Sequence, residues 1–243
     1  MQVDILAIGA HPDDVELSCS GTLLKHIDMG YRVGLLDLTR GELGSRGTTE
    51  IRLKEAARAA ELMGACFRKN LGMPDGFFQH VPEHILAIAQ VVRWCRPKIV
   101  LMNAPQDRHP DHGRAAKLCA DALFYSGLRR IVTTDEAGQA QAPHRPQAAY
   151  HYIQDYQLEA DFVVDISSYM ERKLQLVQAF ESQFHNPKAH QYADEPQTPI
   201  SGEDFLAYLR ARARVYGRPI GVEFAEGFIC VRTPGVPSLF DLV

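Results

Sequence analysis

The stretch QVDILAIGAHPDDVE (residues 2–16) sets ionisable side chains directly behind an apolar run. Residues 2–9 are typical of a buried strand, because they form a short and nearly continuous apolar segment. In an open parallel sheet, ligands bind beyond the carboxyl ends of the strands. The side chains that follow this strand at that end are His11, Asp13, Asp14 and Glu16. The stretch therefore predicts the first strand of an α/β sheet and one part of a ligand site.

Candidate strands and helices alternate along most of the chain, which favours a parallel sheet wrapped on both sides. Further strands are expected at 32–39, 66–71, 98–104, 148–153, 160–166 and 221–231. Helices are expected at 18–29, 48–64, 82–95, 112–126, 167–182 and 203–216. The predicted fold is Rossmann-like α/β, with a mostly parallel sheet, helices on both faces and the active site at the carboxyl ends of the strands.

Length and composition favour an ordinary globular protein. The chain has 243 residues, of which 46% are apolar and 23% charged, so we expect one α/β domain over residues 1–243. Residues 185–203 contain three prolines and no clear periodicity. Long irregular segments in compact domains are often functional. We therefore expect the C-terminal part, 185–243, to include a lid or an interface segment.

Charge and cysteine patterns exclude several classes of partner and site. The net charge of -4 disfavours nucleic-acid binding. The basic cluster LRARARVYGR (209–218) does not keep its arginines on one helical face, which favours a solvated helix or a subunit contact. Five scattered cysteines without a CxxC pair argue against a thiolate cluster. We see no signal peptide and no apolar run long enough for a membrane span, so no membrane partner and a cytoplasmic location are the default expectation.

A second cluster of histidine and aspartate follows the strand expected at 98–104. The segment NAPQDRHPDHGRA (103–115) brings His109, Asp111 and His112 to the same edge of the sheet as the first cluster. Imidazole nitrogen and carboxylate oxygen suit zinc, and a catalytic zinc keeps three protein ligands with an open fourth position. The set His11, Asp14 and His112 meets that requirement, with one Zn²⁺ per subunit and Fe²⁺ as the alternative metal.

The two boxes AHPDDVE (10–16) and HPDH (109–112) resemble those of the LmbE-like (PIG-L) zinc-dependent N-acetylglucosaminide deacetylases. The resemblance continues through TRGELGSRGTTEIRLKEA (39–56), NLGMPDG (70–76) and RARVYGRPIGVEFAEGF (212–228), which look like the bacillithiol branch. It implies removal of an acetyl group from N-acetyl-α-D-glucosaminyl L-malate. It also implies a homo-oligomer, such as a hexamer, acting on a small glycoside.

The resemblance assigns roles to individual residues. His11, Asp14 and His112 become metal ligands, Asp13 the general base, and His109 the group that stabilises the oxyanion. Asp111 is the expected carboxylate partner of a protonated His109. Arg52 is expected to grip the malate carboxylate, since an arginine fork pairs with a carboxylate through two hydrogen bonds. The other expected substrate contacts are Arg46 in the glycine-rich loop (residues 39–47) and Tyr192 in the irregular segment, with His185 and His190 as further candidates. For Glu16, a supporting role near the site and no role in function are equally consistent with the sequence.

Other functions fit the sequence less well than deacetylation does. A dinucleotide site is disfavoured, because the first strand is followed by GAHPDDVE (9–16) and not by GxGxxG. A metal-dependent phosphoesterase or another amidohydrolase is the closer rival, since His/Asp metal sites serve both chemistries. Deacetylation of a different N-acetyl amino sugar also stays open. An inactive interaction module is the weakest alternative, because both boxes are complete.

Overall fold

The computed structural model of the chain describes residues 2–186, 190–192 and 194–242. Its centre is a seven-stranded sheet with the order β3-β2-β1-β4-β5-β7-β6, in which β7 pairs antiparallel with both β5 and β6 and the other four pairings are parallel. The strands are β1 (Ile5–Gly9), β2 (Val33–Thr39), β3 (Phe67–Met73), β4 (Ile99–Met102), β5 (Ala148–Tyr152), β6 (Phe162–Asp165) and β7 (Ala225–Cys230). The predicted α/β fold with a mostly parallel sheet is confirmed.

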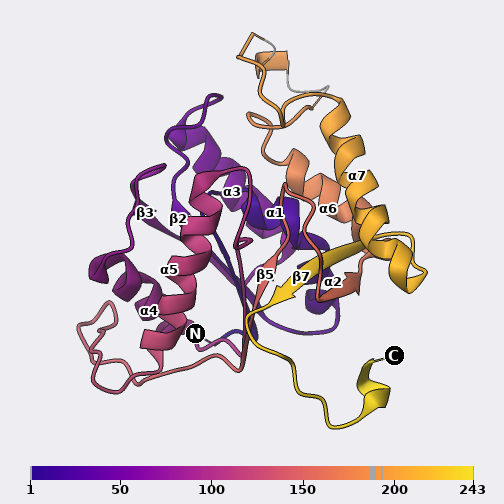
Figure 1. Cartoon of the computed structure of the whole chain (residues 1–243). Helices are drawn as coiled ribbons and strands as arrows, with labels where there is room; N and C mark the ends of the chain where they lie inside the picture. The colour runs from indigo at the N-terminus through magenta and orange to yellow at the C-terminus, as the bar shows by residue number, and fades with distance from the viewer. Residues whose placement is uncertain (1, 187–189, 193, 243) are drawn as a thin grey trace.

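Helices cover both faces of the sheet (Figure 1). They are α1 (Asp14–Ser18), α2 (Ser20–Asp28), α3 (Thr49–Met63), α4 (Pro82–Cys95), α5 (Pro110–Ser126), α6 (Met170–Gln178) and α7 (Asp204–Gly217). An apolar cluster on one face joins β1 and β2 to α4 and α5, while α1, α2, α3 and α6 pack on the other face. Helix α7 contacts β7 and shares an apolar cluster with α3 and α6.

Strand β1 is buried along its whole length because both faces of the sheet are covered. Leu6 and Ile8 belong to the cluster with α4 and α5, whereas Ile5 and Ala7 belong to the cluster on the opposite face. A strand buried on both faces is expected to be apolar at every position. The nearly continuous apolar run in the sequence therefore follows from the place of β1 in the middle of the sheet.

The sheet order creates a ligand site at the end of β1. The chain passes from β1 to β2 on one side and later returns to place β4 on the other side of β1. At such a reversal of strand order, adjacent connections leave on opposite faces and open a crevice at the carboxyl ends of the strands. Residues that follow β1 and β4 therefore meet at one edge, as the sequence predicted.

Several element boundaries differ from those expected. The helix predicted at 18–29 is split at Cys19 into α1 and α2. Helix α5 starts two residues earlier than expected, at Pro110, a favoured residue for a first helical position. The serines at 167–168 form a 3₁₀ turn in place of a helix start, and α6 ends at Gln178, short of the expected residue 182. In the described ranges, no helix combines the length and apolarity that a membrane crossing requires.

A buried ion pair ties the antiparallel part of the sheet to α2 and α6. Glu226 on β7 lies 2.5 Å from Lys173 on α6, and both side chains are 3% exposed. The Glu226 carboxylate also accepts hydrogen bonds from the backbone N–H groups of Gly21 and Thr22 at the start of α2. One carboxylate thus neutralises a buried ammonium and caps a helix.

We expect Glu226→Ala to destabilise the protein by about 3–5 kcal/mol, because it leaves a buried ammonium and two helix N–H groups without a partner. The free energy of unfolding, measured by urea titration, checks this value. Glu171→Ala removes the partner of Arg210 in a pair exposed to solvent, and should change stability little. Equal effects of the two substitutions would contradict the account.

Candidate active site

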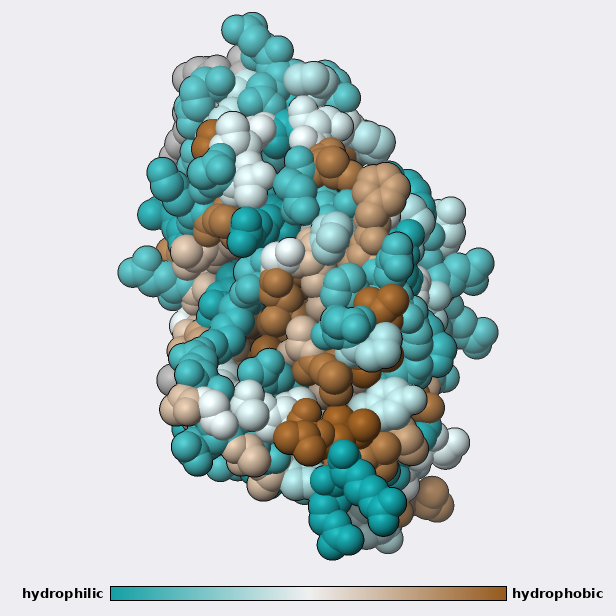
Figure 2. Space-filling view, turned by 90° about the vertical axis from the view of Figure 1, so that its left-hand side faces the viewer, coloured by the Kyte–Doolittle hydropathy of each residue, from teal (hydrophilic) through white to brown (hydrophobic). Residues whose placement is uncertain are grey.

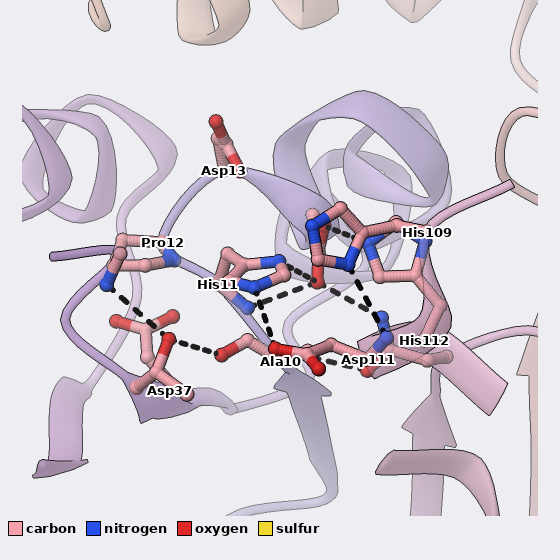
Figure 3. Close-up of polar contacts among 12 residues, drawn as sticks. Ala10, His11, Pro12, Asp13, Asp37, His109, Asp111 and His112 are labelled. Carbon is pink, nitrogen blue, oxygen red and sulfur yellow. Dashed lines mark hydrogen bonds and ion pairs between the residues drawn. The ribbon is translucent and has the colours of Figure 1, made fainter. Parts of the chain in front are cut away.

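Side chains from the two HPD segments meet beyond the ends of β1 and β4. Figure 3 shows the rings of His11, His109 and His112 gathered in one group, with Asp13 to one side. The ring centroids of His11 and His109 are 4.7 Å apart, and those of His109 and His112 are 5.2 Å apart. Residues almost 100 positions apart in the chain are therefore neighbours in space.

One ring nitrogen of His11 is hydrogen-bonded to two carboxylates. Its Nε2 lies 2.9 Å from Asp75 Oδ1 and 3.2 Å from Asp111 Oδ2. Burial alone would lower the pKa of His11, but the hydrogen bonds to Asp111 and Asp75 outweigh it and raise the pKa to about 10. The other ring nitrogen, Nδ1, lies 3.8 Å from Asp14 Oδ2.

His112 is also oriented by carboxylates at both ring nitrogens. Its Nδ1 is hydrogen-bonded to Asp107, and its Nε2 lies 3.2 Å from Asp14 Oδ1. Burial opposes a positive charge on this ring as well, yet the charge of Asp14 and the bond to Asp107 raise the pKa to about 9. Asp14 is the common neighbour of both imidazoles. Two further hydrogen bonds, from Asn103 Nδ2 and Gln154 Nε2, fix its carboxylate.

The donor set fits a metal ion. A histidine ligand characteristically donates its outer ring N–H to a carboxylate, which fixes the ring and leaves the inner nitrogen for the metal. His11 and His112 both show this arrangement, with inner nitrogens that face Asp14. The raised pKa of each ring means that the surrounding carboxylates hold extra positive charge there. A divalent cation satisfies the same negative potential.

Among the residues that the structure describes, two groups of three bring their possible ligand atoms within 4.8 Å of one another. One is His11, His109 and His112, and the other is His11, Asp75 and Asp111. The predicted set differs from the first group by having Asp14 in place of His109. Asp14 approaches the two imidazoles with different carboxylate oxygens, one toward each ring.

Asp13 has an unusual backbone and an arginine partner. Its φ of 137° lies in a region that non-glycine residues rarely adopt, and such strain concentrates at functional sites. Its Oδ2 accepts a hydrogen bond of 2.7 Å from Arg52 Nη2. Burial raises the pKa of Asp13 to about 6 although Arg52 opposes the shift. A carboxylate with a pKa close to neutral can both accept and return a proton.

Arg52 lines the cleft and is bound to the loop that follows β1. Besides the contact with Asp13, its Nε donates to the backbone carbonyl of Pro12. The chain at Gly41 approaches it closely, since a Cβ atom there would lie 2.8 Å from the guanidinium. Arg52 is 8% exposed. Its Nε and Nη2 are therefore engaged by the protein, and the grip on a malate carboxylate stays a prediction that these contacts do not favour.

We expect Arg52→Ala to lower kcat/KM by at least about tenfold on N-acetylglucosaminyl malate and on free N-acetylglucosamine alike. Arg52 lowers the pKa of Asp13, so its removal leaves less ionised carboxylate at neutral pH, and the acid limb of the pH–rate profile should move to higher pH. Steady-state kinetics at several pH values measure both effects. A loss restricted to the malate conjugate would restore the substrate-binding role.

His109 and Asp111 also differ from expectation. The carboxylate of Asp111 contacts His11, the backbone N–H of Gly76 and Arg114, while His109 Nδ1 accepts a hydrogen bond from the backbone N–H of Asp111. Burial and the charge of His11 lower the pKa of His109. The lowered pKa and the contacts of Asp111 therefore favour a neutral His109 over the predicted imidazolium held by the Asp111 carboxylate. A neutral ring with its proton on Nε2 still offers one donor to the cleft.

Glu16 has a supporting position beneath the site. Its Oε1 lies 2.6 Å from Arg68 Nη1, and the same guanidinium forms two hydrogen bonds with Asp37 on β2. These contacts join α1, β2 and β3 under the loop that carries His11 and Asp13. Glu16 is fully buried and is not among the described residues that line the cleft, so the supporting role that the sequence left open is the one its contacts favour.

The other predicted substrate contacts lie away from the reacting groups. Arg46 is buried, and its guanidinium donates to the backbone carbonyls of Ser182, Tyr192, Glu195 and Pro196. It thereby anchors the irregular segment to the chain at Ser182. Neither Arg46, Tyr192 nor His185 belongs to the described residues that line the cleft, and the His190 side chain is outside the described part of the structure.

Four residues at the site were missed by sequence reasoning: Asp75, Asn103, Asp107 and Gln154. Asn103 and Asp107 lie in the segment 103–115 and Asp75 lies in the segment 70–76, so their place in stretches already singled out was the signal available in the sequence. Asp75 accepts a hydrogen bond from the backbone N–H of Leu43 as well as contacting His11, and so connects the glycine-rich loop to the histidine.

The site opens into a cleft of about 330 Å³. Its inner end is lined by His11, Asp13, Asp14, His109 and His112. Thr198, Pro199 and Ile200 contribute from the irregular segment, and α7 contributes a further wall. The volume is at the lower end of the range for sites that bind small molecules.

Comparison with known proteins identifies relatives of this chain. The family model described as PIG-L, GlcNAc-PI de-N-acetylase, matches residues 6–123. A diacetylchitobiose deacetylase from Thermococcus kodakarensis is 35% identical over 245 residues, with coverage of 96% of this chain and 84% of the relative. A probable N-acetyl-α-D-glucosaminyl L-malate deacetylase 2 from Bacillus anthracis is 25% identical, with coverage of 74% and 81%.

The crystal structure of the conserved protein TT1542 from Thermus thermophilus is similar over nearly the whole chain. It superposes with a TM-score of 0.82 at 36% identity, and the match covers 97% of this chain and 98% of that one. The fold of this chain is thus shared with that protein over nearly its whole length.

Proposed function

The chain belongs to the PIG-L family of hydrolytic N-deacetylases, and from this premise we propose that it removes the acetyl group from the N-acetylglucosamine part of a glycoside. The observation that carries the proposal is the pairing of His11 Nδ1 and His112 Nε2 around Asp14, with the outer nitrogen of each ring held by a carboxylate. His11, Asp14 and His112 are the residues proposed to hold a metal ion, and zinc suits this mixed nitrogen and oxygen set.

The chemistry follows from what each side chain offers. A bound zinc ion lowers the pKa of its water to about 7. Asp13 accepts a proton from the attacking water at Oδ1, since Oδ2 is engaged by Arg52, and passes it to the leaving amine. His109 donates from Nε2 to the oxygen that gains negative charge. Removal of one such donor typically costs roughly 3 to 4 kcal/mol of transition-state stabilisation.

Two substrates are proposed, in order. N-acetyl-α-D-glucosaminyl L-malate is the first, because stretches over much of the chain resemble the bacillithiol branch and the Bacillus anthracis relative carries that activity in its name. Diacetylchitobiose is the second, because the relative with 35% identity is named for it. A phosphoesterase is not favoured, since the carboxylates around the site would repel a phosphate group.

The test is an assay of amine release with zinc-reconstituted protein. The panel contains N-acetylglucosaminyl malate, N,N'-diacetylchitobiose and free N-acetylglucosamine, with a phosphodiester as the rival substrate. We expect equal amounts of acetate and free amine from at least one glycoside, and none after chelation of the metal. Hydrolysis of the phosphodiester without amine release would overturn the proposal.

Assembly into a homo-oligomer is a further part of the proposal. Figure 2 shows apolar side chains gathered in a band on one face of the molecule, between hydrophilic regions. Large apolar side chains exposed to solvent in the chain alone include Phe77 at 74%, Val132 at 71% and Phe240 at 86%. Exposed apolar patches mark interaction surfaces. The molar mass in solution, measured by light scattering, distinguishes a monomer from a hexamer.

A further inference from the structure

Helix α7 forms a second wall of the cleft, opposite the metal-binding residues. Phe205, Tyr208, Leu209 and Arg212 line the cleft from this helix. The Tyr208 hydroxyl donates to the backbone carbonyl of Asp155 at 2.9 Å, which fixes α7 against the segment that follows β5. The cleft thus combines a polar inner end with an outer wall that is mostly apolar and carries one arginine.

Three arginines line the cleft within the described residues, namely Arg52, Arg108 and Arg212. Arg52 is paired with Asp13 at 2.7 Å, and Arg108 with Asp155 at 3.0 Å. For Arg212 the described structure shows no carboxylate within ion-pair distance. Its one hydrogen bond to a described residue, from Nη2 to the carbonyl of Leu17, is long at 3.4 Å. Arg212 is therefore the cleft cation whose charge is least engaged.

The neighbours of Arg212 on α7 show that this is not a general feature of the helix. Arg210 forms two hydrogen bonds with Glu171, and Arg214 forms one with Glu223, both at exposed positions. Arg212 instead turns toward the cleft, where its guanidinium carbon lies 5.8 Å from the centre of the Tyr208 ring. A cation on an aromatic face keeps its N–H groups free for an anion.

Arg212 lies where a substrate group attached next to the reacting acetamido group would be expected. Leu17, which it contacts, is on α1 and its backbone N–H donates to the carbonyl of Asp13. The guanidinium therefore contacts the residue that lies one helical turn after the proposed base, and both Arg212 and Asp13 line the same cleft. In a glycoside of N-acetylglucosamine, the aglycone is on the carbon adjacent to the one that carries the acetamido group. An aglycone therefore extends into this outer part of the cleft.

We propose that Arg212, supported by Tyr208, determines substrate specificity by binding a negatively charged group on the aglycone. This inference rests on the proposed deacetylation of an N-acetylglucosamine glycoside and narrows its substrate class to conjugates with an anionic aglycone. It transfers to Arg212 the role that sequence reasoning gave to Arg52. Charge-assisted hydrogen bonds of this kind are strong enough to discriminate between substrates.

The test compares Arg212→Gln with Arg210→Gln, a matched control on the same helix outside the cleft. Substrates are N-acetylglucosaminyl malate, which is anionic, and methyl N-acetyl-α-D-glucosaminide, which is neutral. We expect Arg212→Gln to lower kcat/KM for the malate conjugate by at least about tenfold and to change the neutral glycoside less than twofold. Arg212→Lys should recover part of the loss, and added salt should weaken only the anionic substrate.

Failure of this inference is distinct from failure of the proposed function. Suppose that the wild type deacetylates both glycosides. The role of Arg212 is then overturned if Arg212→Gln has the same kcat/KM values as Arg210→Gln, or if its kcat/KM falls equally for both substrates. If the wild type releases no amine from either of these glycosides or from N,N'-diacetylchitobiose, the proposed function fails. In that case calorimetric binding of the malate conjugate decides the inference: weaker binding by Arg212→Gln than by Arg210→Gln supports it, and equal binding overturns it.

Discussion

We expect Asp13→Asn to have a kcat about 10²- to 10⁴-fold lower than that of the wild type and to keep its metal. The amide has the shape of the carboxylate but cannot accept a proton from water at ordinary pH. Asp13 lines the cleft beside the proposed ligand Asp14, and its pKa of about 6 suits proton transfer near neutral pH. Turnover on N-acetylglucosaminyl malate and metal content by mass spectrometry measure the two effects separately.

Comparison with a second substitution separates catalysis from folding at this position. Asp13→Gly removes the side chain and relieves the strained φ of 137°, but it also leaves the buried Arg52 guanidinium without its carboxylate, so turnover should be abolished and stability should fall. An Asp13→Asn protein that is inactive, folded and loaded with metal shows that the carboxylate is needed for chemistry and not for folding. Near-normal turnover of Asp13→Asn would exclude Asp13 as the base.

We expect Asp14→Ala to lose the bound metal and to have a kcat at least about a hundredfold lower than that of the wild type. Asp14 faces both imidazoles, so its removal takes away one proposed ligand and the negative charge between the other two. Replacement of a residue that only orients a ligand usually costs 10- to 100-fold in metal affinity or activity. Asp107→Asn, which weakens the support of His112, therefore provides a graded comparison.

Metal content and turnover should fall together in these two variants, with the larger loss in Asp14→Ala. Zinc titration with a competing chelator gives the affinity, and excess zinc should restore activity to Asp107→Asn more fully than to Asp14→Ala. Full metal content in Asp14→Ala would remove Asp14 from the ligand set and favour His109 in its place.

The fold and the centre of the site could be predicted from the sequence because each depends on local pattern. A strand buried on both faces must be apolar throughout, so β1 and its end were recognisable, and ligands collect where such strands end. Two HPD segments at strand ends then led to the prediction of His11, Asp14 and His112 as ligands, and the structure brings these side chains together. Helix boundaries were less accurate, since the break at Cys19 leaves no proline or glycine signal.

Residues whose role depends on distant partners could not be assigned. An arginine fork fits a substrate carboxylate and the carboxylate of Asp13 equally well, and only the packing of α3 against the first box decides between them for Arg52. Asn103 and Gln154 resemble ordinary loop residues until β4 and β5 bring them to Asp14. Arg212 was grouped with its neighbours because periodicity alone does not reveal which arginine of α7 faces a cleft.

The position of the metal tests the account most directly. Crystals of zinc-loaded protein, with anomalous diffraction measured at the zinc edge, locate the ion without reference to activity. The account predicts a single peak at roughly 2.0 to 2.2 Å from His11 Nδ1, a carboxylate oxygen of Asp14 and His112 Nε2, with an open position toward Asp13. A peak bound by His11, Asp75 and Asp111, or no peak at the end of β1, would contradict it.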